Sequence, residues 1–194
     1  GQGFSFDGSS GNITISNEEN FDFERTDSFS GCLWVNFDTI GNNVHTPLSK
    51  LLNSGTYSGW ELHTWDSTSG DNAGDAISLY IVENWGDSKC IFASAENVLA
   101  GTADTWQHIC FTYNGSSTVS GVKIYQNGVS KTVIDSAAWC TTPPSGSVLN
   151  NVPLLIGERE MSVNTFNGTL DEVRVWNRSL SADEIYQQYA SNLN

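Results

Sequence analysis

Four tryptophans lie where an indole ring could contact a ligand. The chain has 7 tryptophans in 194 residues, and four of them fall at the ends of predicted strands or in loops: Trp60, Trp65, Trp85 and Trp139. Exposed indoles stack on the apolar faces of sugar rings, and loops carry binding residues more often than core strands do. We therefore predict that these side chains form a platform for a carbohydrate, with burial in the core as the alternative for each.

Two glutamates, Glu158 and Glu160, alternate along the chain and would face the same side of a strand. Glycosidases use a pair of carboxylates as nucleophile and acid. Here, however, Arg159 separates the two, and no third carboxylate extends the pattern. The three histidines have no G-x-S-x-G nucleophile motif to serve. No catalytic residue is assigned, and the chain is predicted not to be an enzyme.

The composition is that of a folded, acidic chain. Hydrophobic residues make up 38%, and the net charge is −14. Such a charge repels a phosphate backbone or an anionic membrane surface. No apolar run approaches the ~20 residues that a membrane span needs. We expect cations, sugars or other proteins as partners, and neither nucleic acid nor membrane insertion. A purely solubilising role for the acidic residues is the alternative.

The cysteines and sequons indicate an exported protein, secreted or held at the cell surface. The four cysteines lack C-x-x-C spacing and are even in number, which favours two disulfides over a metal or redox motif. They are Cys32, Cys90, Cys110 and Cys140. Four N-x-S/T triplets are candidate glycosylation sites. Their asparagines are Asn12, Asn114, Asn167 and Asn177.

Short strands account for most of the chain. Alternating apolar residues and turn signals predict strands near residues 4–6 and 13–15, over 29–37, 48–52, 60–65, 77–82, 90–95, 106–114 and 152–156, and a hairpin over 122–134 turning at Asn127-Gly128. Many short strands at such spacing predict two packed antiparallel sheets. No linker or repeat divides the chain, so residues 1–194 are predicted to form one domain.

The end of the chain carries the clearest local signals. Leu170, Val173 and Val175, with Trp176, predict a strand with one buried face. Ser181 and Glu184 then form a capping box. Leu180 and Ile185 stand at the hydrophobic-staple spacing around the same cap, so a short helix is predicted to begin there. Its apolar contacts are expected from Tyr186, Tyr189 and Leu193.

These segments resemble a known family. The run G-x-L-D-E-V-R-V-W at 168–176, followed by N-R-x-L-S-x-D-E-I at 177–185, resembles the closing signature of laminin G-like, concanavalin A-like jelly-roll domains, the superfamily that includes pentraxins. The F-D-G at 6–8, the strand at 28–35, the W-x-H-I-C segment from 106 and the hairpin at 122–128 resemble other parts of that pattern. The resemblance implies an all-β, two-sheet antiparallel jelly-roll β-sandwich with a short C-terminal helix.

The resemblance also implies a disulfide pairing. Cys32 and Cys110 occupy the positions of the pentraxin disulfide, which leaves Cys90 to pair with Cys140.

Calcium is a further implication of the resemblance. Pentraxin-like domains hold calcium with an Asp-Asn pair and acidic residues after an L-I-G strand, which implies Asp71, Asn72, Glu158 and Glu160 here. The segment departs from the family pattern, because Arg159 intrudes and Met161 replaces an expected acid. An alternative is a structural calcium held by Asp7 and Asp171 from paired terminal strands.

Together these features predict an extracellular carbohydrate- or glycoprotein-binding or adhesion module, assisted by calcium. The alternative hypothesis is a structural subunit that binds copies of itself or another protein in an extracellular oligomer or filament. A glycoside hydrolase-like enzyme is a minor alternative.

Overall fold

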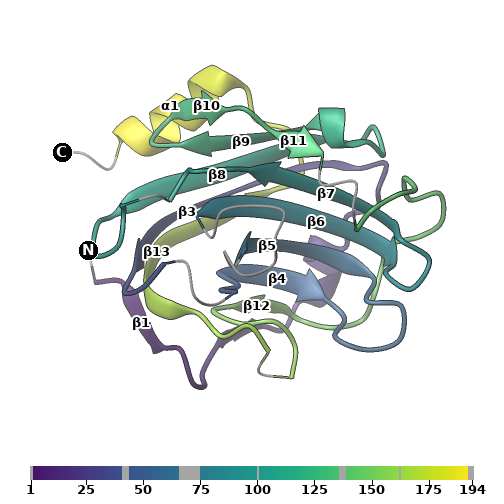
Figure 1. The fold of residues 1–194 in the computed structure, drawn as a ribbon, viewed down its shortest axis with the longest axis horizontal. Helices are drawn as coiled ribbons and strands as arrows, with labels where there is room; N and C mark the ends of the chain where they lie inside the picture. The colour runs from purple at the N-terminus through teal and green to yellow at the C-terminus, as the bar shows by residue number, and fades with distance from the viewer. Residues whose placement is uncertain are drawn as a thin grey trace.

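Two antiparallel sheets stack face to face in the computed structural model (Figure 1), which describes residues 2–40, 44–65, 75–99, 101–135, 139–161 and 163–191. The six-stranded sheet has the order β1 (Phe4–Asp7), β13 (Asn167–Trp176), β3 (Ser28–Phe37), β8 (Gln107–Asn114), β9 (Val122–Gln126) and β10 (Val129–Lys131). The seven-stranded sheet has the order β11 (Ile134–Asp135), β7 (Lys89–Ala95), β6 (Ala76–Asn84), β5 (Gly59–Trp65), β4 (Leu48–Leu51), β12 (Leu154–Ile156) and β2 (Ile13–Ile15). The predicted all-β sandwich is confirmed.

The core lies between the sheets and is rich in aromatic rings. Phe29 stacks on Phe23 with ring centroids 4.6 Å apart, and it meets Trp60 at 5.2 Å and Phe111 at 5.6 Å. Residues of one parity on each strand supply this layer, as the two-residue period of a strand requires. Residues of the other parity face outward on both sheets.

At two places, strands that follow one another in the sequence belong to different sheets. Strands β1 and β2 form around the turn at 7–11, but β1 pairs with β13 and β2 pairs with β12 of the other sheet. Likewise, β10 returns along β9, whereas Ile134 of β11 pairs with Ser94 of β7. The chain therefore crosses between layers at both places. The 3-10 helices η1 (Glu18–Phe21) and η3 (Val119–Gly121) complete the connections.

A bulge in β13 places two apolar residues on the same face although they are an odd number of positions apart. Leu170 and Val173 are three residues apart, so a regular strand would turn them to opposite faces. The β13–β3 register shifts between Asp171 and Arg174, and Glu172 has φ 53°. This extra residue lets Leu170 and Val173 both pack on the inter-sheet core. Trp176, predicted on that same face, packs instead on the helix side of the sheet.

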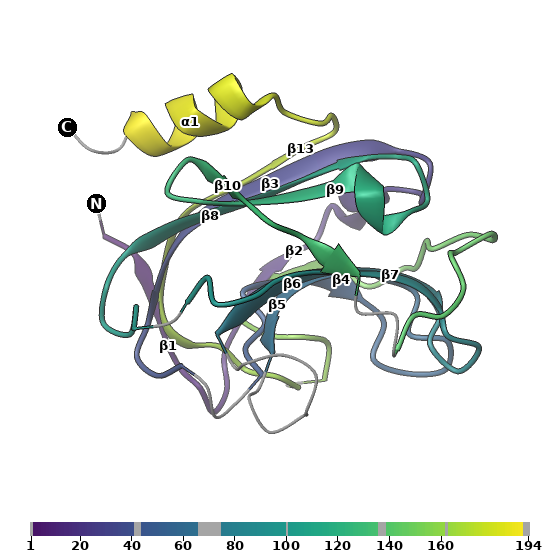
Figure 2. The same cartoon turned by 45° about the horizontal axis from the view of Figure 1, so that its top comes forward.

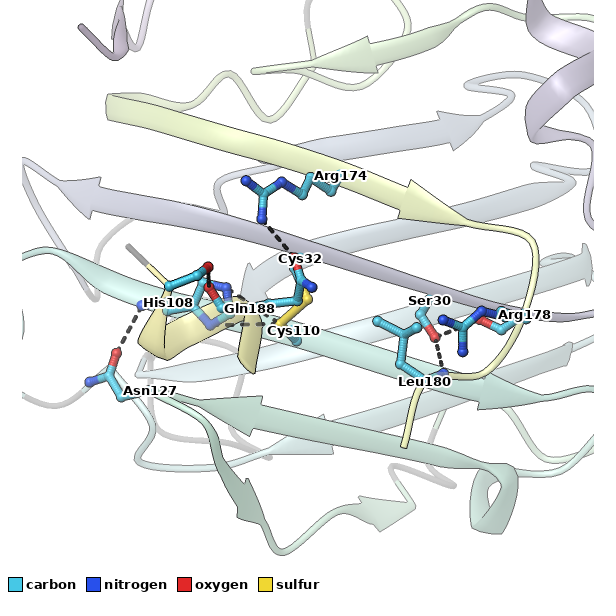
Figure 3. The surroundings of a disulfide bond; sticks show 10 residues. Ser30, Cys32, His108, Cys110, Asn127, Arg174, Arg178, Leu180 and Gln188 are labelled. Atoms are coloured by element: carbon cyan, nitrogen blue, oxygen red, sulfur yellow. Dashed lines mark hydrogen bonds between the residues drawn. A yellow bond between two sulfur atoms is a disulfide. The ribbon is translucent and has the colours of Figure 1, made fainter. Parts of the chain in front are cut away.

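Helix α1 (Ala182–Ala190) covers the outer face of the six-stranded sheet (Figure 2). Both hydrogen bonds of the predicted capping box are present, and Leu180 and Ile185 are buried. Beneath the helix, Cys32 and Cys110 face each other across β3 and β8 and form a disulfide (Figure 3). The ring of Tyr189 stacks on Trp34 at 5.8 Å.

Two expected helix contacts differ. Tyr186 is 56% exposed, and its contacts are limited to the edge of Tyr189, with 6.3 Å between ring centroids, and the β9–β10 turn at Gly128. Leu193 lies outside the described residues.

Candidate functional site

The outer face of the seven-stranded sheet carries a second, smaller apolar cluster. Its buried members alternate with core residues along β4, β6 and β7: Leu51, Tyr80, Val82, Cys90 and Phe92, joined by Cys140. Tyr57 and Trp85 pack against this cluster from the loops and stay half-buried. Since α1 lies on the opposite side of the molecule (Figure 2), this face can receive a ligand.

A cavity of about 340 Å³ opens on this face. We call it the Arg159 pocket. Its lining residues are Val44, Leu51, Tyr57, Tyr80, Val82, Trp85, Arg159 and Asn164. The strands supply the floor, whereas Tyr57 comes from the β4–β5 loop, Trp85 from the turn after β6, and Arg159 and Asn164 from the β12–β13 connection. The volume lies within the range of small-ligand sites.

Hydrogen bonds donated by backbone amides tie the three loops of the rim together. The amide of Trp85 donates to the carbonyl of Thr56 at 2.9 Å. The amide of Asn53 donates to the Glu160 carboxylate at 2.9 Å, which links the β4–β5 loop to the β12–β13 connection. The amide of Arg159 donates to the Val163 carbonyl at 2.9 Å and closes a small hairpin. These hydrogen bonds fix the rim loops relative to one another, so the pocket is formed without a ligand.

A buried ion pair forms the polar wall of the pocket. Arg159 donates from Nε to Glu61 Oε2 at 2.8 Å and from Nη2 to Oε1 at 2.5 Å. Glu61 is fully buried on β5 and also accepts from the Ser49 hydroxyl at 3.1 Å. Its Oε1 lies 2.8 Å from Nδ1 of His63. Four donors thus surround one carboxylate. Its two oxygens have about four lone-pair positions, so all of them are occupied.

The charges in this network are fixed by their surroundings. Burial alone would raise the pKa of Glu61, but the hydrogen bonds and charge of Arg159 outweigh it and lower the pKa to about 2. Burial lowers the pKa of His63, so its ring is neutral and Nδ1–H donates to Glu61. Although burial opposes it, Glu61 raises the pKa of Arg159. Arg159 and Glu61 are therefore both ionised at neutral pH.

Aromatic rings continue from the pocket across the sheet. Tyr80 meets Trp85 edge-on at 5.3 Å, and Trp85 lies nearly parallel to Trp139, with 17° between the planes and 6.3 Å between centroids. Trp139 is 41% exposed. The Cys90–Cys140 disulfide joins the segment that carries Trp139 to β7. Both implied disulfides are therefore present.

The predicted platform of four tryptophans is only partly assembled. Trp85 lines the pocket, and Trp139 lies beside Trp85 without being among the residues that line it. Trp60 does not belong to it, because it is 2% exposed in the core and its indole N–H donates to the Phe21 carbonyl at 3.1 Å. It shares the inward parity of Leu62 on β5. Trp65 is the last residue of β5, and its side chain lies outside the described structure.

Of the residues implied for calcium, the two that the structure describes, Glu158 and Glu160, bind different partners. Glu158 is buried and accepts from the Asn12 amide at 2.6 Å, while its Oε2 has no hydrogen-bond partner among the described residues. Glu160 binds the Asn53 amide instead. Asp71 and Asn72 lie outside the described residues, so the four-residue set stays a prediction.

The alternative pair, Asp7 and Asp171, does not converge. Asp7 pairs with Asn167 in the β1–β13 register, which leaves Asp171 four residues along β13, about 13 Å away at the usual strand rise. The Asp7 carboxylate caps its own turn by accepting from the amides of Ser9 and Ser10. These hydrogen bonds lower its pKa.

The four sequons differ in their surroundings. Asn114 and Asn177 are exposed, Asn167 is half-buried on β13, and the amide of Asn12 is engaged by Glu158. Their glycosylation stays a prediction.

Sequence reasoning missed the Arg159 pocket itself. Glu61 and Arg159 are 98 positions apart, and no motif joins them. One available signal was the alternation of Glu61 and His63 with Trp60 and Leu62 in a strand whose other face is apolar. Polar residues on a strand that is buried on both faces indicate a hydrogen-bonded network.

Two stacked antiparallel sheets, with a helix on one outer face and a pocket on the other, define a β-sandwich of lectin-like architecture. The family model of the concanavalin A-like lectin/glucanases superfamily matches residues 7–186. The chain belongs to this family.

One protein of related sequence and two solved structures of similar fold can be compared with this chain. Human adhesion G-protein coupled receptor D1 is 32% identical over 92 residues, which cover 44% of this chain and 9% of the receptor. The Ruminococcus gnavus IT-sialidase CBM40 bound to α2,6-sialyllactose superposes with a TM-score of 0.67 at 11% identity, covering 96% and 95% of the two chains. Domain 4 of a Geobacillus stearothermophilus extracellular arabinanase, in complex with arabinotriose, gives 0.58 at 16% identity, covering 96% and 76%. These likenesses show the shared fold.

Within the described ranges, no helix has both the length and the apolar character needed to cross a membrane.

Proposed function

We propose that this domain binds carbohydrate in the Arg159 pocket. The observation that carries the proposal is the combination, in one cavity of about 340 Å³, of aromatic walls with a guanidinium held in place from behind. A sugar ring has apolar C–H faces and a polar rim of hydroxyls, so it needs both kinds of wall.

The polar groups that remain available suit sugar hydroxyls. Arg159 uses Nε and Nη2 for Glu61, and within the described part of the chain nothing accepts from Nη1. The Asn164 side chain also lines the cavity. Trp85 and Tyr57 would contact the ring, while Arg159 and Asn164 would hydrogen-bond its hydroxyls. Because the rim is already tied together, little ordering would be needed on binding.

The proteins of similar fold support this choice of ligand class. Two of them were solved in complex with a sugar, sialyllactose in one and arabinotriose in the other. The two disulfides further suggest that the domain works outside the cell.

The experiment is a glycan array followed by calorimetric titration of the best ligand against two tryptophan variants. Trp85→Ala should weaken binding at least about ten-fold, which corresponds to about 1.4 kcal/mol. Trp106→Ala is the matched control, because Trp106 is 42% exposed and lies outside the pocket. Equal affinity in both variants, or an array with no signal, would reject the proposal.

Calcium is a separate proposal. Oε2 of Glu158 is buried and has no hydrogen-bond partner among the described residues, and such a carboxylate oxygen fits a cation that prefers oxygen ligands. Bound there, calcium would supply a positive charge that balances the buried carboxylate. Adding Ca²⁺ should then raise the melting temperature by several degrees, and Glu158→Gln should abolish the increase. A melting temperature that changes neither when Ca²⁺ is added nor when chelator is added would contradict the calcium proposal.

A further inference from the structure

The Arg159 pocket contains a cation whose charge is already balanced. Among its described lining residues, Arg159 is the only charged one. Behind it lies the Glu61 carboxylate, bound through two hydrogen bonds and fully buried. The other groups packed on Glu61 are the Ser49 hydroxyl and a neutral His63. The cluster therefore has one positive and one negative charge.

This balance changes what the guanidinium can recognise. A carboxylate placed against Nη1 would be attracted by Arg159 and repelled by Glu61, which lies about twice as far away, so about half of the attraction is cancelled. The carboxylate would also lose its hydration on entering the pocket. The chain as a whole, at a net charge of −14, repels anions before contact.

An uncharged hydroxyl does not incur these penalties. It can accept from Nη1, which keeps its donors, and the hydrogen bond is strengthened by the charge on the guanidinium. The phenol of Tyr80 is also uncharged, because burial raises its pKa. The floor of the pocket adds only the apolar side chains of Leu51 and Val82.

From this arrangement we propose that the Arg159 pocket selects neutral sugars over acidic ones, with Glu61 as the residue that sets the preference. The inference depends on the proposed carbohydrate binding and names its ligand class. Glu61 does not contact the ligand. It acts by holding Arg159 and by neutralising its charge.

The test compares matched pairs of oligosaccharides that differ only in an acidic group. Lactose and N-acetyllactosamine are titrated beside their α2,3- and α2,6-sialylated forms, and xylo-oligosaccharides beside their glucuronic acid-substituted forms. Each titration is made at about 20 mM and about 300 mM NaCl, since salt screens charge-driven binding. We expect at least one neutral member to bind about ten-fold or more tighter than its acidic partner, with less than about two-fold change with salt.

A charge variant tests the role of Glu61 directly. Glu61→Gln keeps the shape of the side chain and removes its charge, so Arg159 becomes an unbalanced cation. The ratio of the affinity for acidic members to the affinity for their neutral partners should rise at least about ten-fold, whatever the loss that both classes share when Arg159 is held less firmly. Glu172→Gln is the matched control, because Glu172 also pairs with an arginine but lies on β13 of the other sheet.

The outcomes separate the two proposals. Tighter binding of acidic members by the native protein, with affinity that falls with salt, would overturn the preference and leave carbohydrate binding intact. Equal responses of the Glu61→Gln and Glu172→Gln variants would overturn the role of Glu61. Binding of no member of either class would overturn the proposed function and this inference together.

Discussion

Replacing Lys50 by methionine should destabilise the fold more than most single substitutions. Lys50 lies on β4 between the sheets and is 1% exposed. Its Nζ lies 2.9 Å from Glu18 Oε2 and 2.6 Å from Asp22 Oδ1. It also donates to the carbonyls of Asn150 and Val152, each at 3.1 Å. One ammonium thus joins three segments that are distant in sequence.

The magnitude follows from what the substitution leaves behind. Methionine keeps the packing of the side chain but removes the charge, so two carboxylates, two backbone carbonyls and the side-chain oxygen of Asn150 lose a shared donor. Breaking a buried ion pair from one side costs about 3–5 kcal/mol. Glu18 and Asp22 are each about a quarter exposed, so water replaces part of the lost interaction. We expect a loss of about 3 kcal/mol, or about 6–12 °C in melting temperature for a domain of this size.

Urea unfolding followed by circular dichroism measures this loss. Lys123→Met is the matched control, because Lys123 is exposed on β9, and it should change the free energy of unfolding by less than about 0.5 kcal/mol. A loss below about 1 kcal/mol in Lys50→Met would refute the reasoning, since the ammonium would then contribute no more than a surface ion pair.

Three further predictions concern stability. The pKa of Glu61 is lowered to about 2 in the folded protein. Its ionised form therefore stabilises the fold by about 3 kcal/mol above the unfolded pKa, and this contribution is lost as pH falls from about 4.5 through 2. Glu61→Gln should flatten this part of the plot of urea midpoint against pH, and an unchanged plot would contradict the prediction. Replacing Cys90 and Cys140 by alanine opens a loop of 50 residues and should cost about 4 kcal/mol on the chain-entropy model; calorimetric unfolding at equal scan rate measures this, and a cost under about 1 kcal/mol would count against it. Ser181→Ala removes the cap of α1 and should cost about 1 kcal/mol, seen as a lower urea midpoint, whereas no shift would show that the helix is held by Leu180 and Ile185 alone.

The closing strand and helix were predictable because their signals are local. Ser181, Glu184, Leu180 and Ile185 fall within six residues, and the structure uses all four as expected. The bulge at Glu172 was not predicted, although the change of parity between Leu170 and Val173 required some such irregularity.

Features that depend on distant pairing could not be predicted in this way. The turn at 7–11 is visible in the sequence, but the separation of β1 and β2 into different sheets is decided by β13 and β12, about 150 residues later. The same limit applies to the pocket. The β12–β13 connection brings Arg159 to Glu61, and no motif or periodic pattern in the sequence indicates that contact. Trp60 looked like a strand-end residue, whereas its parity with Leu62 was the better indicator of burial.

The position of α1 affects how the domain can be attached to anything else. Strand β1 and the C-terminal end of α1 lie at the same end of the sandwich (Figure 2) and belong to the six-stranded layer. The pocket rim, with Trp85 and Arg159, lies over the other, seven-stranded layer. A partner that bound over α1 would therefore leave the pocket on the opposite face uncovered.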